Sequence, residues 1–177
     1  MNRSRDNGSM QKAVAVCLLV VVSFLGCDRD PTGRAEGTLC DPSEPLPSPS
    51  PSFPPARGLI DTGDDSVLVN LVVAETTEQQ VFGLMHRESF PEDCGMVFLF
   101  MERRTGGFWM KNTLIPLSIA FFDESGEIKA ILDMEPCKKD PCKIYDPGTA
   151  YSGALEVNQG KFDEWGVEVE DEISITR

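Results

Sequence analysis

Residues 114–132, LIPLSIAFFDESGEIKAIL, contain the pattern that decides the fold. Apolar side chains alternate with small or polar ones from Ile115 to Phe121, and this period of two is typical of a strand with one buried face. The residues around Gly126 have the composition of a tight turn, and the alternation resumes at Ile128. The stretch therefore predicts a β-hairpin.

Other parts of the chain extend this hairpin to a larger sheet. Strand-like apolar runs occur at four further places, residues 66–74, 95–101, 150–157 and 167–175. Thr76 and Gln79 form a capping-box pattern for one short helix, and Asn158 is expected to cap a second that ends at Gly166. Hairpin connections and few helices predict an α+β fold, in which a mainly antiparallel β-sheet is curled into an open barrel-like core with two short helices. We expect this globular domain to span residues 62–177.

A block of mixed chemistry precedes the hairpin. Residues 108–113, FWMKNT, place aromatic, thioether, cationic, amide and hydroxyl side chains next to one another, which a strand does not require. Because the alternation begins only at Ile115, these side chains are available to line the mouth of a concave site. We expect a ligand-binding site, with Arg87 and Glu156 paired to hold its shape, built from Arg87, Trp109, Met110, Asn112, Thr113 and Glu156.

A structural interpretation competes with this binding site. Asn112 and Thr113 would then cap a turn, and Trp109 and Met110 would belong to the core or to a lid. Arg87 would bind backbone carbonyls or a structural carboxylate. The presence of arginine, asparagine, threonine and glutamate together favours a site, because a core does not require that combination.

Three blocks of the sequence resemble a known family. They are FGLMHRESFPEDCGMVFLF (82–100), FWMKNTLIPLSIAFFDESGEI (108–128) and ALEVNQGKFDEWGVEVEDEI (154–173). In this order they resemble the bacterial and archaeal family called domain of unknown function 192, over about residues 67–175. The resemblance implies a compact β-barrel-like α+β domain, commonly exported or membrane-tethered, and implies no established activity. The chain departs from the family at Ser118, where aspartate is typical, so no catalytic or metal-binding part is carried over to that position.

The N-terminal segment has the composition of an export signal. Basic residues precede an apolar run from Ala13 to Cys27, which is too short to cross a bilayer as a helix but has the length of a signal-peptide core. Gly26 before Cys27 resembles a bacterial lipobox, with Phe24 where leucine is usual. We expect a lipoprotein-type signal peptide over residues 1–26 and lipidation of Cys27. A conventional signal peptide and an uncleaved anchor are the alternatives.

Residues 27–60 have the composition of a tether. Eight of the chain's thirteen prolines lie between Asp28 and Gly58. Proline-rich sequence favours the extended polyproline II conformation and cannot bury a core. The sequence therefore predicts a semi-stiff, proline-rich tether between the lipid anchor and the domain.

The remaining cysteines predict one local disulfide. Cys137 and Cys142 lie in EPCKKDPCKIY, each after a proline, and exported proteins form such bonds. We expect Cys94 to be a buried thiol and Cys40 to be free in the tether. A Cys40–Cys94 bridge is the alternative, and it would tie the tether to the domain. Half of a zinc site is a weaker alternative because His86 is the only histidine, so neither a metal nor a cofactor is expected.

These features favour binding over catalysis. The sequence offers no convincing Ser-His-Asp or Cys-His arrangement and no phosphate-binding glycine loop. The net charge of −13 repels nucleic-acid backbones, so no nucleic-acid partner is expected. The leading interpretation is a monomeric, lipid-anchored domain of the bacterial cell envelope, facing the periplasm or the cell surface, that binds a small ligand or an envelope protein. The alternative is an envelope hydrolase or transferase that uses Glu156 with Arg87.

Overall fold

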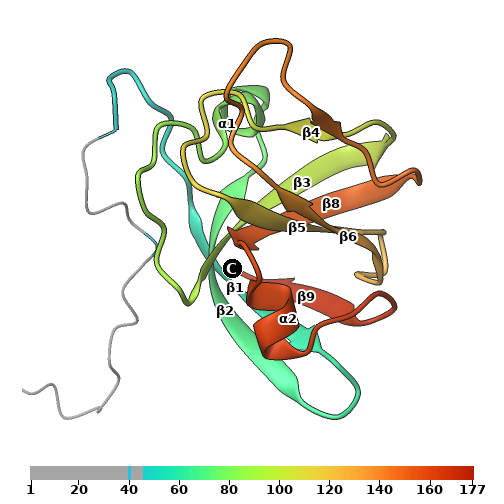
Figure 1. Cartoon of the computed structure of the whole chain (residues 1–177). Coiled ribbons are helices and arrows are strands. Elements are labelled where there is room, and N and C mark those ends of the chain that lie inside the picture. The colour runs from blue at the N-terminus through green and yellow to red at the C-terminus, as the bar shows by residue number, and fades with distance from the viewer. Residues whose placement is uncertain (1–39, 41–45) are drawn as a thin grey trace, which may run out of the picture. The chain divides into compact units, whose positions relative to one another are not determined.

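One seven-stranded sheet forms the centre of the described structure (Figure 1). The computed structural model describes Cys40 and residues 46–177. The strands of the sheet are β1 (Pro55–Asp61), β2 (Ser66–Ala74), β3 (Cys94–Arg104), β5 (Leu117–Phe122), β6 (Ile128–Met134), β8 (Tyr151–Asn158) and β9 (Glu172–Thr176). Their order across the sheet is β6-β5-β8-β3-β2-β1-β9, and β4 (Phe108–Trp109) and β7 (Ile144–Tyr145) form a separate two-stranded sheet.

The hairpin predicted at residues 114–132 is confirmed as strands β5 and β6. The two strands are antiparallel, with Ser118 opposite Asp133 and Ile119 opposite Leu132. Gly126 in the connecting turn has a φ of 95°, a left-handed conformation that glycine adopts without a steric penalty. The local pattern of alternation and turn chemistry was therefore sufficient to identify this pair.

Strands β2 and β3 form the parallel pair of an otherwise antiparallel sheet. A parallel neighbour requires a crossover connection, and the segment that contains helix α1 (Thr77–Phe82) supplies it. The capping box predicted for this helix is confirmed. Thr76 Oγ1 accepts a hydrogen bond from the Gln79 N–H at 3.2 Å, and Gln79 Oε1 accepts one from the Thr76 N–H at 3.0 Å.

The second helix, α2 (Lys161–Trp165), ends at Gly166 as predicted but does not begin as predicted. Its N-cap is Gly160, which has no side chain to cap the helix. The expected cap, Asn158, is still part of β8, and its Nδ2 donates a hydrogen bond to the Phe90 carbonyl at 2.8 Å. That distant partner could not be recognised from the local sequence.

The expected barrel-like curl was wrong. The described part of the chain is mainly β, with a mixed sheet that is neither closed nor strongly curled and with helices of only six and five residues. The outermost strands, β6 and β9, approach each other at one corner, where the Ile128 N–H donates to the Asp171 carbonyl and the Ile173 N–H to the Gly126 carbonyl, both at 2.8 Å. Pairing at that corner does not continue into a ladder, so the edges stay separate over most of their length.

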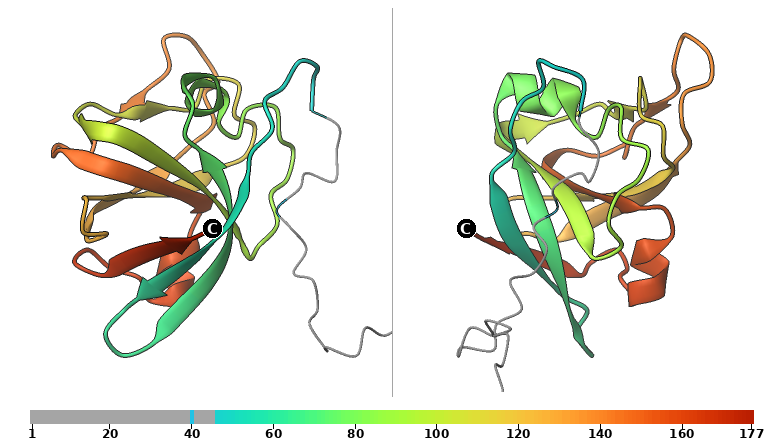
Figure 2. Two further views of the ribbon diagram at one scale, coloured as in Figure 1. Left: turned by 180° about the vertical axis from the view of Figure 1, so that it is seen from behind. Right: turned by 90° about the vertical axis from the view of Figure 1, so that its left-hand side faces the viewer.

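Apolar clusters cover both faces of the sheet. The β4 face carries Met96, Phe98, Ile119 and Phe121, and the opposite α2 face carries Val97, Ala120, Leu155 and Phe162. Successive residues of a strand point to opposite faces, so the central strands are buried on both sides, and every residue of β5 is buried. Figures 1 and 2 show α1 and β4 at one end of the sheet, and α2 with the β1–β2 turn toward the other.

A disulfide between Cys40 and Cys94 corrects the expectation that both thiols are free. Each of the two cysteines is only 1% exposed and belongs to the cluster on the β4 face. Strand β1 pairs with β2 and β9, and all of it except Asp61 lies in residues 27–60, the range expected to be a tether. Proline content suggested a tether there, but proline is tolerated at the first residue of a strand, where Pro55 lies. The folded domain therefore begins before residue 62.

The predicted signal peptide and the lipidation of Cys27 lie outside the described residues. Among Cys40 and residues 46–177, no helix is long and apolar enough to cross a membrane. The second disulfide, Cys137–Cys142, is present as predicted.

The two disulfides should contribute unequally to stability. Cys40–Cys94 spans a sequence separation of 54 and Cys137–Cys142 one of 5. Chain entropy then predicts that the paired serine variant of Cys40 and Cys94 loses about 4 kcal/mol of unfolding free energy, and that of Cys137 and Cys142 about 2 kcal/mol. Urea denaturation of the purified proteins measures both values, and a larger loss from the short loop would contradict this ranking.

Candidate functional site

The FWMKNT block begins as strand β4, which has an inner and an outer side. Phe108 points inward, with its ring centroid 5.0 Å from that of Phe98 and 5.6 Å from that of Phe121. Trp109 points to the other side, opposite Ile144 of β7, and both side chains are about half exposed, at 52% and 54%. Trp109 is therefore a surface residue rather than part of the core.

Residues 110–113 form a turn that is bonded to the segment after α1. Met110 is buried, and the Thr113 N–H donates to its carbonyl at 3.2 Å. Asn112 has a φ of 57°, and its carbonyl accepts a hydrogen bond from the His86 N–H at 2.9 Å. Its side chain lies 3.8 Å from Met85 Sδ. Asparagine is one of the few residues other than glycine that adopts this left-handed conformation readily, so Asn112 has a backbone role here.

Arg87 lies directly after His86 and is therefore carried to the same region as the Asn112 turn. Its side chain is buried, with 3% exposed, and its guanidinium carbon lies 5.5 Å from the centroid of the Phe90 ring. Stacking on an aromatic face suits the planar, weakly hydrated guanidinium. The backbone hydrogen bond from His86 to Asn112 therefore holds the chain segments of Arg87 and Asn112 next to each other.

Glu156 lies in the middle of the sheet, on strand β8. It is opposite Met96 on one side and Ile119 on the other, and both neighbours are fully buried on the β4 face. The Glu156 side chain is 5% exposed, and burial raises the pKa of its carboxyl from 4.5 to about 8. At neutral pH this carboxyl is therefore mostly protonated.

The expected ion pair between Arg87 and Glu156 is not formed. Both residues are described, and none of the ion pairs among the described residues joins them. A guanidinium in contact would lower the pKa of Glu156, whereas burial raises it and no nearby cation offsets the effect. The two side chains are held separately, Arg87 against Phe90 and Glu156 between its strand neighbours.

Ser118, where the chain departs from the typical family sequence, has a structural contact. Its hydroxyl donates a hydrogen bond to Asp133 Oδ1 on the neighbouring strand, and it accepts one from the Gly160 N–H at 2.9 Å. The hydroxyl therefore joins β5 to β6 and to the start of α2. This contact accounts for a buried polar residue in β5 without any ligand.

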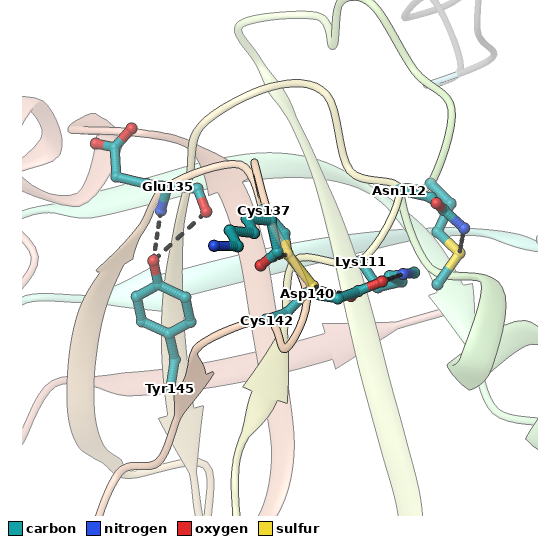
Figure 3. Close-up of a disulfide and its surroundings, with 9 residues drawn as sticks. Lys111, Asn112, Glu135, Cys137, Asp140, Cys142 and Tyr145 are labelled. Carbon is teal, nitrogen blue, oxygen red and sulfur yellow. Dashed lines mark hydrogen bonds and ion pairs between the residues drawn. A yellow bond between two sulfur atoms is a disulfide. The ribbon is translucent and has the colours of Figure 1, made fainter.

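A cavity of about 270 Å³ opens beside the FWMKNT block. Met110 forms part of its wall, and the rest of the wall comes from residues 135–145. This second segment is held in shape by the Cys137–Cys142 disulfide and by Tyr145, whose hydroxyl accepts a hydrogen bond from the Glu135 N–H at 2.8 Å (Figure 3). Of the six expected site residues, the cavity includes Met110.

The Cys137–Cys142 disulfide was predicted from the sequence. The position of residues 135–145 in a cavity wall was not predicted. The feature of the sequence that could have indicated a site in this segment is its three lysines, at 138, 139 and 143, in a chain of net charge −13. What could not be read from the sequence was the pairing of β4 with β7, which brings residues 144–145 beside Phe108 and Trp109.

The family profile described as DUF192, an uncharacterized ACR family, matches residues 59–175. The chain belongs to the DUF192 family. No curated protein matches it significantly. Its fold is similar to that of a Sinorhizobium meliloti 1021 protein named as a candidate transcription regulator, with 29% identity, a TM-score of 0.66, and 71% of this chain and 96% of that chain covered.

A second solved structure gives the same fold for a relative without an assigned role. It is a protein of unknown function from Novosphingobium aromaticivorans DSM 12444, with 23% identity and a TM-score of 0.65. The match covers 75% of this chain and 93% of that chain. At this identity the likeness concerns the fold alone.

The buried carboxyl of Glu156 should make stability depend on pH. The folded protein keeps a proton on Glu156 up to about pH 8, whereas an unfolded chain releases it near pH 4.5, so rising pH favours unfolding across this window. Relative to Glu156→Gln, the wild type should lose about 1.4 kcal/mol of unfolding free energy per pH unit between about pH 5 and 8. Urea denaturation at several pH values measures the difference.

The control for this prediction is Glu88→Gln, which makes the same chemical change at an exposed site. Its stability profile should run parallel to that of the wild type. If the Glu156→Gln profile were also parallel to the wild type, the Glu156 carboxyl would not be held protonated by the fold.

Proposed function

We propose that this DUF192 protein is a lipid-tethered domain of the cell envelope that binds a small ligand or an envelope protein beside the FWMKNT block. The observation that carries the proposal is the cavity of about 270 Å³ whose wall includes Met110. A concave site near the size range of small-molecule pockets, with a rigid wall, is suited to binding. The disulfide and the Tyr145–Glu135 hydrogen bond supply that rigidity.

The two sides of the site have different roles in this proposal. Met110 contributes an apolar surface to the cavity, and Trp109 and Ile144 present an exposed apolar pair on the outside of the β4–β7 ribbon. The turn itself is stabilised by the hydrogen bond from the His86 N–H to the Asn112 carbonyl and by burial of Thr113. Arg87 is buried too, and none of these residues lines the cavity. Small ligands would use the cavity, and a protein partner would add contact with the exposed pair.

The catalytic alternative, a hydrolase or transferase that uses Glu156 with Arg87, has less support. A general acid must be within hydrogen-bonding reach of its substrate, and Glu156 lies in the sheet core and does not line this cavity. Its raised pKa suits an acid held protonated near neutral pH, which is the observation in favour of this alternative. The missing contact with Arg87 removes the partner that the mechanism would use.

Location in the envelope is supported by the chemistry of the cysteines. Two disulfides are consistent with an oxidising, extracytoplasmic compartment. The apolar run ending at Cys27 adds a lipidation signal, and several acyl chains would hold the protein to a membrane where one would not. The protein would then face the periplasm or the cell surface as a monomer.

A nucleic-acid partner is not part of the proposal, although one relative is named for transcription. The net charge of −13 opposes contact with a phosphate backbone, which otherwise supplies most of the affinity of such complexes. We therefore do not propose a role in transcription for this protein.

Membrane attachment should depend on one residue outside the described range, Cys27. Mass spectrometry of the mature protein should find a diacylglyceryl group on that cysteine. Cys27→Ala should move the protein from the membrane fraction to the soluble fraction after cell lysis. Retention of Cys27→Ala in the membrane fraction would show that another element anchors the protein.

Ligand binding should respond to Met110 but not to a matched methionine. Met110 and Met134 are both at most 1% exposed and belong to the same cluster, and only Met110 lines the cavity. Methionine-to-leucine changes conserve volume and should each cost less than about 1.5 kcal/mol of stability. Native mass spectrometry of protein isolated from its own envelope should show a co-purifying small molecule that Met110→Leu reduces and Met134→Leu retains. Equal retention by both variants would contradict a site at this cavity.

A further inference from the structure

Three lysines without a carboxylate partner line the cavity beside Met110. Among the described residues, Lys111, Lys129 and Lys161 each form ion pairs with aspartate or glutamate. The other lysines of this part of the chain form none, and all of them line the one cavity; they are Lys138, Lys139 and Lys143. Among the described residues, the lysines that form no ion pair are therefore concentrated at this cavity.

This concentration is notable because the protein is strongly acidic, with 29 acidic and 16 basic residues. Carboxylates are abundant, so lysines could readily have been paired as the others are. The three lysines are exposed at the mouth of one cavity, where like charges repel one another and raise the local concentration of anions. An anion in the cavity would offset that repulsion and gain from all three ammonium groups.

Two carboxylates of residues 135–145 have partners other than these three lysines. Asp140 forms an ion pair with Lys111, which belongs to the FWMKNT block (Figure 3). Glu135 Oε1 accepts a hydrogen bond from Gln159 Nε2 at 3.2 Å. Asp140 is thus paired with a lysine of the FWMKNT block, and Glu135, which also lines the cavity, forms no ion pair with the three lysines.

The wall of the cavity also has an apolar part and is held in place. Lys143 Nζ lies 4.3 Å from the centroid of the Tyr145 ring, which fixes one ammonium group against the wall. Met110, Tyr145 and the prolines at 136 and 141 supply carbon surface beside the charges. The disulfide limits the motion of the segment that carries Lys138 and Lys139. A prearranged site loses less conformational entropy when it binds.

We propose that this cavity binds a small organic anion through a phosphate or carboxylate group held by Lys138, Lys139 and Lys143. Ammonium groups form charge-assisted hydrogen bonds with both kinds of oxygen. The apolar wall contacts the carbon part of the same molecule. This inference rests on the proposed function, because it names the ligand class of the same site.

The test uses the mature lipoprotein in phosphatidylcholine nanodiscs, with amide signals followed by NMR. The anionic probes are inorganic phosphate, glycerol 3-phosphate and glucuronate, and the neutral probes are glycerol and glucose. Glycerol 3-phosphate or glucuronate should shift the signals of Met110 and residues 135–145 in a saturable way. Its dissociation constant should rise with salt concentration, as expected for binding by charge.

Variants separate the lysines from general charge effects. The combined change of Lys138, Lys139 and Lys143 to glutamine should weaken binding at least about tenfold, equivalent to roughly 1.4 kcal/mol. Arg103→Gln, which removes one positive charge at an exposed site on β3, should change the dissociation constant by less than about twofold. Equal weakening by both proteins would overturn the assignment to these lysines.

The remaining outcomes distinguish this inference from the proposed function. Shifts at Met110 and residues 135–145 with the neutral probes alone would overturn the anion class and leave a binding site at the cavity. Shifts that appear with phosphatidylglycerol in the nanodisc and with none of the free anions would assign the lysines to a membrane surface and overturn the small-molecule site. No shift in this region with any probe or lipid would contradict both.

Discussion

Burial of both faces of the central strands is the constraint on which the rest of the structure depends. Strand β5 has no exposed residue. Its neighbour β8, and β3 on the far side of β8, continue the same two clusters. Figure 1 shows the three strands side by side. A sheet buried on both sides needs cover on both sides, and helices of six and five residues are too short to provide it alone. The β4–β7 ribbon and the loops around it complete the cover on the β4 face, which places the FWMKNT block and the disulfide loop together.

The same constraint explains the two polar features that are hardest to place in a sheet. Glu156 occupies a central position of β8 on the β4 face, where burial keeps its carboxyl protonated near neutral pH. Ser118 faces the other cluster and is satisfied by Asp133 and by the start of α2. Glu156 therefore belongs to the inside of the fold, whereas the cavity lies between the ribbon and the disulfide loop.

How much could be predicted from the sequence depended on how local the determining interaction was. The β5–β6 hairpin, the capping box of Thr76 and Gln79, and the Cys137–Cys142 disulfide each involve residues close together in the chain, and all three are confirmed. The Cys40–Cys94 disulfide and the position of β1 depend on contacts over a long separation, and the proline content concealed both. The predicted ion pair between Arg87 and Glu156 was wrong because it rested only on their opposite charges. The sequence did not show that Glu156 lies inside the sheet core.

We propose that the cavity between Met110 and the disulfide loop holds an anionic ligand. This is tested by a crystal structure of the protein purified from its native cells without added phosphate or carboxylate buffer. Electron density too large for water is expected in the cavity, with an anionic group within hydrogen-bonding distance of the Lys138, Lys139 or Lys143 ammonium groups. A cavity that contains only water, with unassigned density at another face of the sheet, would contradict it.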